Sequence, residues 1–135
     1  MSLPNSTAKA KIMVVEDESI IALDLQIGLE EAGYTVISVV SSGEEAINRC
    51  ADLEPDLLLM DIHLGGPLDG IETARHIQRG QDIPILFLSA SIDDLTLKRA
   101  QGIHAAGYIA KPFDAQSISR NIAAVLTNNQ SEIPL

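Results

Sequence analysis

The chain has 135 residues, of which 46% are hydrophobic and 21% charged, so it suits one globular domain with its own core. Its formal net charge of −10 argues against a nucleic-acid surface, because phosphates need basic partners. The single cysteine, Cys50, excludes an internal disulfide and fits a reducing cytoplasm. No apolar run approaches the roughly 20 residues that span a bilayer, which argues against a membrane protein.

The first part of the chain predicts a leader and two strand–helix units. Residues 1–10 lack a hydrophobic signal core and are expected to be a flexible leader. Gly33 stops the first helix, and Ser42 with Glu45 has the spacing of a capping box at the start of the second. The spacing of apolar residues predicts a strand at 11–15, a helix at 20–32, a strand at 34–40 and a helix at 42–53.

The middle of the chain contains the most apolar short segment. Four apolar residues in a row, followed by Asp61, predict a strand at 56–61 that is buried on both faces. The elements expected after it are a helix at 70–79, a strand at 83–89, a helix at 93–100, a strand at 107–110 and a helix at 114–126. Residues 128–135 form a polar tail that we expect to be flexible, so the domain covers 11–127.

The strict alternation of strands and helices predicts a parallel sheet with helices on both faces. Five such units fit a doubly wound α/β fold of the flavodoxin-like kind, with strand order 2-1-3-4-5 and five helices. The first and third strands are neighbours in that order. Glu16, Asp17 and Asp61, at the ends of these strands, should therefore converge at one edge of the sheet.

Three convergent carboxylates repel one another unless a cation or a proton lies among them. Hard oxygen ligands select Mg²⁺, Mn²⁺ or Ca²⁺, and Mg²⁺ suits phosphoryl transfer. The alternative is that Glu16 and Asp17 only cap the first helix. Ser89 and Lys111 end the fourth and fifth strands, where they could hold phosphoryl oxygens on Asp61, although singly they suit a helix-entry serine and a solvated lysine.

Five short motifs at the strand ends carry a resemblance to a known family. They are Val14-Val15-Glu16-Asp17-Glu18, Leu59-Met60-Asp61, Asp69-Gly70, Leu88-Ser89-Ala90 and Tyr108-Ile109-Ala110-Lys111-Pro112-Phe113. Taken together they resemble the receiver domain of two-component response regulators, and the resemblance covers about residues 11–127.

The resemblance implies that Asp61 accepts a phosphoryl group from a phosphohistidine on a sensor histidine kinase or a phosphotransfer protein. It also implies a Mg²⁺ ion bound by Asp17, by Asp61 and by the backbone carbonyl of His63, with Glu16 acting through metal-bound water. The side chain of His63 projects near the acceptor, and an exposed bystander is the alternative to a role in hydrolysis.

For the switch, the resemblance implies that Lys111 pairs with the phosphoryl oxygens and is followed by a cis peptide bond to Pro112. Ser89 would swing to bond another phosphoryl oxygen, and Tyr108 would follow inward. The face of the fourth helix, fifth strand and fifth helix would then be remodelled for an output partner or output domain. The protein is thus expected to be a switch that assists its own phosphorylation and dephosphorylation, not a turnover enzyme.

Three other functions compete with this interpretation. A phosphatase with an Asp nucleophile generally needs a second carboxylate two residues on, where His63 stands. A flavodoxin-like FMN carrier would suffer repulsion between the flavin phosphate and the acids at 16–18. An inactive docking module usually lacks one of the site residues. A stand-alone regulator, a phosphorelay intermediate and a receiver cut from a longer protein stay open, as does a homodimer.

Overall fold

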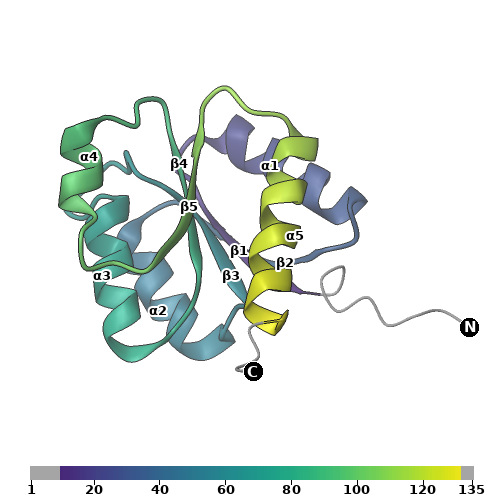
Figure 1. Cartoon of the computed structure of the whole chain (residues 1–135), viewed down its shortest axis with the longest axis horizontal. Coiled ribbons are helices and arrows are strands. Elements are labelled where there is room, and N and C mark those ends of the chain that lie inside the picture. The colour runs from purple at the N-terminus through teal and green to yellow at the C-terminus, as the bar shows by residue number, and fades with distance from the viewer. Residues whose placement is uncertain (1–9, 132–135) are drawn as a thin grey trace, which may run out of the picture.

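The computed structural model describes residues 10–131, so residues 1–9 of the expected leader (1–10) and residues 132–135 of the expected tail (128–135) lie outside it. The strands are β1 (Lys11–Val15), β2 (Thr35–Val40), β3 (Leu57–Asp61), β4 (Ile85–Ser89) and β5 (Ala105–Ala110). The helices are α1 (Ser19–Glu31), α2 (Gly43–Leu53), α3 (Gly70–Gly80), α4 (Asp94–Arg99) and α5 (Ala115–Ser131). The strands form one parallel sheet in the order β2-β1-β3-β4-β5, which confirms the predicted fold (Figure 1).

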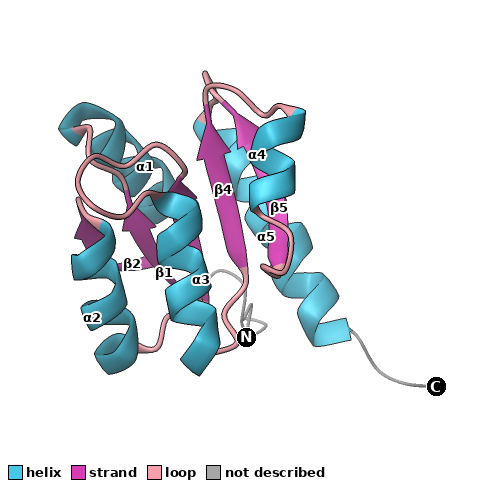
Figure 2. Ribbon diagram, turned by 90° about the vertical axis from the view of Figure 1, so that its left-hand side faces the viewer, coloured by secondary structure: helices cyan, strands magenta, loops and turns pink. Residues whose placement is uncertain are grey.

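The core lies on both faces of this sheet. Every residue of β3 and β4 is buried, as expected for central strands with helices on both sides. Successive β3 residues point to opposite faces: Met60 packs in a cluster with Ile71 of α3, and Leu59 packs in a cluster with Ile122 of α5. Figure 1 shows α2, α3 and α4 on one side and α1 with α5 on the other, and Figure 2 shows the sheet between them.

Two helices begin with side-chain caps. The Ser42 hydroxyl accepts a hydrogen bond from the Glu45 amide at 3.2 Å, but the Glu45 carboxylate contacts the Ser41 amide and not that of Ser42. The predicted capping box of α2 is therefore only half formed. A complete capping box starts α3, where Asp69 and Glu72 each accept from the other's amide.

Element boundaries differ from the expectation where the local pattern is weak. β4 starts at Ile85 and not at 83, and the Pro84 carbonyl next to it accepts from the neighbouring strand β3. β5 starts two residues earlier than expected, at Ala105, because alanines carry no strand pattern. α5 continues to Ser131, beyond its last expected apolar position. Among residues 10–131, no helix combines the length and apolarity needed to cross a membrane.

Candidate functional site

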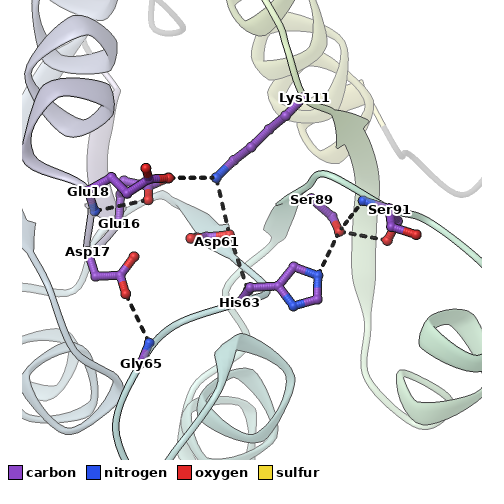
Figure 3. A network of polar contacts seen from close by, with 9 residues as sticks. All are labelled: Glu16, Asp17, Glu18, Asp61, His63, Gly65, Ser89, Ser91 and Lys111. Atoms are coloured by element: carbon purple, nitrogen blue, oxygen red, sulfur yellow. Dashed lines mark hydrogen bonds and ion pairs between the residues drawn. The ribbon is translucent and has the colours of Figure 1, made fainter.

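The carboxyl ends of four neighbouring strands meet at one edge of the sheet (Figure 3). Glu16 and Asp17 directly follow β1, Asp61 ends β3, Ser89 ends β4 and Lys111 directly follows β5. Parallel strands point their carboxyl ends the same way, so side chains far apart in the sequence come together here.

Three carboxylates form the centre of the site. One oxygen from each of Glu16, Asp17 and Asp61 lies within 4.8 Å of the others. Glu16 and Asp61 are 1% and 2% exposed, whereas Asp17 is exposed. Burial, and after it the charge of Asp61, raises the pKa of Glu16 to about 7. This concentration of negative charge and hard oxygen donors fits Mg²⁺, which these three side chains could hold.

Lys111 supplies positive charge to these acids. Its Nζ lies 3.3 Å from Glu16 Oε1, 3.5 Å from Asp61 Oδ1 and 3.9 Å from Glu18 Oε1. Burial by itself lowers the pKa of Lys111, but the charges of Asp61 and Glu16 outweigh burial, so the pKa is raised and the ammonium stays charged. The peptide bond from Lys111 to Pro112 is cis, as the resemblance implied.

The loop after β3 encloses the acids with backbone groups. The His63 amide donates to Asp61 Oδ1 at 3.2 Å, and the Gly65 amide donates to Asp17 Oδ2 at 3.0 Å. The loop then returns to the strand at Gly70, whose amide bonds the Ile62 carbonyl at 2.8 Å. A Cβ atom at Gly70 would collide with the carbonyl oxygen of Asp61, so only glycine fits this approach.

The two expected switch residues lie outside the network of charged groups. The Ser89 side chain is fully buried, and its hydroxyl donates to the Ser91 carbonyl at 2.7 Å and contacts His63 Nε2 at 3.3 Å. Tyr108 is half-buried on β5, where its ring stacks on Phe87 with centroids 5.5 Å apart. The structure thus brings the three acids and the lysine together, and Ser89 is linked to Asp61 through His63.

Two contacts of this region were not predicted from the sequence. One is the contact of the His63 ring with Ser89, and the other is an ion pair of 2.7 Å between Arg99 of α4 and Asp69, the residue that caps α3. The spacing of Asp69 and Glu72 could have identified the cap. No sequence pattern predicts these two long-range contacts, because each depends on how a loop or a helix end lies against a distant element.

Comparison with known sequences places the chain in context. A family model for the response regulator receiver domain matches residues 12–123. The alkaline phosphatase synthesis transcriptional regulatory protein PhoP of Bacillus subtilis is 35% identical over 125 residues, covering 92% of this chain and 51% of that protein. The transcriptional regulatory protein AfsQ1 of Streptomyces coelicolor is 31% identical over 121 residues, covering 90% and 53%. The chain spans about half the length of these relatives.

Solved structures give the same picture. The signal receiver domain of a modulated diguanylate cyclase from Desulfovibrio desulfuricans is 39% identical, with a TM-score of 0.85 over 93% of this chain and 99% of that one. The N-terminal domain of a response regulator/sensory box/GGDEF protein from Carboxydothermus hydrogenoformans is 31% identical, with a TM-score of 0.84 over 92% and 99%. The response regulator PhyR from Brucella abortus, at 23% identity and a TM-score of 0.80 over 93% and 52%, shares the fold.

Proposed function

The chain belongs to the response regulator receiver domain family, and we propose that it works as a phosphorylation-controlled switch with Asp61 as the phosphoacceptor. The observation that carries this proposal is the buried Asp61 carboxylate at the end of β3, surrounded by two further acids and the Lys111 ammonium. A carboxylate in this position is a nucleophile with a cation beside it, which suits transfer of a phosphoryl group.

The proposed reaction is a displacement at phosphorus. The ammonium of Lys111 and the amide of His63 both contact Asp61 Oδ1, so the attack is assigned to Oδ2. A P–O bond forms to Oδ2 while the P–N bond of a donor phosphohistidine breaks, and the electron pair of that bond returns to the imidazole nitrogen. The role of Lys111 is to balance charge on the transferred group, which its raised pKa favours.

Glu16, Asp17 and Asp61 are the side chains proposed to hold Mg²⁺, with the carbonyl of His63 as a further ligand and Glu16 acting through water. When bound, the ion would offset the repulsion between the carboxylates and the incoming phosphoryl oxygens. Burial, and after it the charge of Asp61, raises the pKa of Glu16, and a bound cation would offset the second of these effects.

The proposed output is a change on the face formed by α4, β5 and α5. Ser89 would turn its hydroxyl to the phosphoryl group, and Tyr108 would move inward beside β5. In the structure Ser89 ends the strand next to β5, and the Tyr108 ring packs on Phe87 of that same strand, so a shift at Ser89 can reach the tyrosine through β4.

Partners and setting complete the proposal. The phosphoryl donor would be a sensor histidine kinase or a phosphotransfer protein. The signal would pass on to an output partner, an output domain or a second copy of the chain. The switch would assist its own phosphorylation and dephosphorylation. We place it in the cytoplasm, where the free, buried thiol of Cys50 stays reduced.

Acetyl phosphate with Mg²⁺ tests the proposal. We expect the intact mass of the wild-type chain to rise by one phosphoryl group and that of Asp61→Asn to stay unchanged. Asp56→Asn is the matched control: Asp56 lies at the other end of β3, where its carboxylate accepts from the Lys11 amide, and this variant should be labelled normally. Equal labelling of wild type and Asp61→Asn would refute the assignment of the acceptor.

A further inference from the structure

We infer that His63 is a positioning residue whose ring holds the hydroxyl of Ser89 in its resting orientation, so that it sets how readily the switch responds. This inference rests on the proposed function, in which Ser89 turns toward the phosphoryl group. It concerns the side chain of His63, whereas the metal assignment above concerns only its backbone carbonyl.

The contacts around the Ser89 hydroxyl carry the inference. A hydroxyl has one proton to donate and two lone pairs to accept with. Ser89 Oγ donates to the Ser91 carbonyl at 2.7 Å and accepts from the Ser91 amide at 3.1 Å. The third contact is His63 Nε2 at 3.3 Å. Because the hydroxyl proton is already committed to the carbonyl, the histidine must be the donor, and its neutral form carries the proton on Nε2.

The serine is therefore saturated in the resting state. Its side chain is fully buried in the resting structure, where all three of its hydrogen-bonding positions have protein partners. To reach a phosphoryl group on Asp61, the hydroxyl must break these three contacts, one of which comes from His63. Removing the ring should favour the turned state by about fivefold, the usual net effect of one hydrogen bond.

His63 lies between the proposed phosphoacceptor and the proposed switch serine. Its amide donates to Asp61 Oδ1 at 3.2 Å, and its ring, which is exposed, lies on Ser89 (Figure 3). One residue thus bonds the proposed phosphoacceptor through its backbone and the proposed switch hydroxyl through its side chain. An exposed ring adds little to the core, so its substitution should leave the fold intact.

Three substitutions at His63 separate the hydrogen bond from other effects of the side chain. His63→Gln places an amide nitrogen the same number of bonds from the backbone as Nε2, so it keeps a donor within reach of Ser89. His63→Asn has a shorter amide that ends at the level of Nδ1 and cannot reach, and His63→Ala has no donor. All three keep the backbone amide and carbonyl.

The first measurement needs neither metal nor phosphoryl group. Three-bond proton couplings of Ser89 report its side-chain rotamer in each variant. We expect a single rotamer in wild type and His63→Gln, and averaged couplings in His63→Ala and His63→Asn. Identical couplings in all four proteins would overturn the inference, whatever the fate of the proposed function.

The second measurement adds Mg²⁺ and beryllofluoride, a phosphoryl mimic, and follows the amide signal of Tyr108. At saturation His63→Ala should show an active-to-resting ratio about fivefold above wild type, while His63→Gln should match wild type. In a Ser89→Ala background the substitution His63→Ala should change nothing further, and an undiminished change there would refute the proposed route through the serine. Failure of the mimic to bind wild type would count against the proposed function, and the rotamer couplings would still decide the role of His63.

Discussion

Two successive strand–helix units of this domain, β3–α3 and β4–α4, have the same topology and are held in different ways. Both strands are buried throughout. The eleven residues of α3 include five that are buried, and the helix starts with a complete capping box, whereas the six residues of α4 include none that is buried. The core therefore holds α3 but not α4.

Polar contacts hold α4 in place of a core. Asp93 caps the helix by accepting from the Thr96 amide at 2.8 Å, Arg99 pairs with Asp69, and Arg75 of α3 donates to the Arg99 carbonyl at 2.7 Å. Such bonds can be exchanged with water at little cost, unlike buried apolar contacts. The proposed acceptor Asp61 thus lies on a strand that leads into a well-buried helix, next to a helix with no buried residue.

The largest expected contrast comes from truncating one apolar side chain in each helix. Ile71→Ala in α3 removes a fully buried side chain and should lower the free energy of unfolding by about 3 kcal/mol. Leu95→Ala in α4 removes a side chain that is 67% exposed and should change it by less than about 0.5 kcal/mol. Urea unfolding measures both, and similar losses would show that α4 is held by packing after all.

A second contrast lies at the two ends of α3. Gly70→Ala forces a Cβ against the backbone of Asp61 and Ile62, so it should cost about 2 kcal/mol and weaken phosphoryl uptake. Gly80→Ala is the control, because its Cβ would meet nothing within 4 Å and alanine favours a helix. If both variants unfold at the same urea concentration as wild type, α3 does not depend on its close approach to β3.

The charged edge around β3 predicts a pH dependence that the neutral end of β4 lacks. The folded state raises the pKa of Glu16 from 4.5 to about 7, so it keeps a proton that the unfolded chain has released. This contribution to stability is complete below pH 4.5 and is lost as the pH rises through 7. Without Mg²⁺ we expect a loss of roughly 1.5 kcal/mol between pH 5 and 7.5.

Unfolding curves at several pH values check this expectation. Glu16→Gln should flatten the dependence, while Ser89→Ala at the end of β4 should leave it as in wild type. Mg²⁺ should restore stability at the higher pH, because an ion that binds the folded state and not the unfolded chain raises the free energy of unfolding. A slope that persists in Glu16→Gln would assign the titration to another group.

The smallest expected effect concerns the ion pair between Arg99 and Asp69, whose side chains are 43% and 26% exposed. Asp69→Asn keeps a good N-cap and removes the charge, and Arg99→Gln removes the other partner. A double-mutant cycle should give a coupling of about 0.5 kcal/mol that vanishes in high salt. Amide exchange in α4 should quicken in both variants and not in the control Arg79→Gln. No coupling at low salt would remove this pair from the list of contacts that hold α4.

The sequence predicted the fold and the convergence of the acids because both depend on strong local patterns. A short apolar run such as Leu57–Met60, bounded by turn residues, favours a buried strand, and strict alternation with helices leaves few sheet orders. The carboxylates of Glu16, Asp17 and Asp61 then meet because neighbouring parallel strands end at one edge.

Other features depended on tertiary contacts that no local pattern encodes. The ring of His63 meets Ser89 only because the loop after β3 turns back toward β4, and Arg99 meets Asp69 only because α4 ends beside the start of α3. The early start of β5 at Ala105 was not predicted for a different reason: these residues form a strand because they pair with β4, not because of their side-chain preference.

The sheet order also governs when the site can exist during synthesis of the chain. β1 lies between β2 and β3, and the groups that meet at its end come from positions as distant as Glu16 and Lys111. A nascent chain that has emerged from the ribosome as far as β3 holds all three acids without the ammonium that faces them. Because non-local pairing of parallel strands forms late, the proposed site is complete only after Lys111 has emerged and β5 has paired with β4.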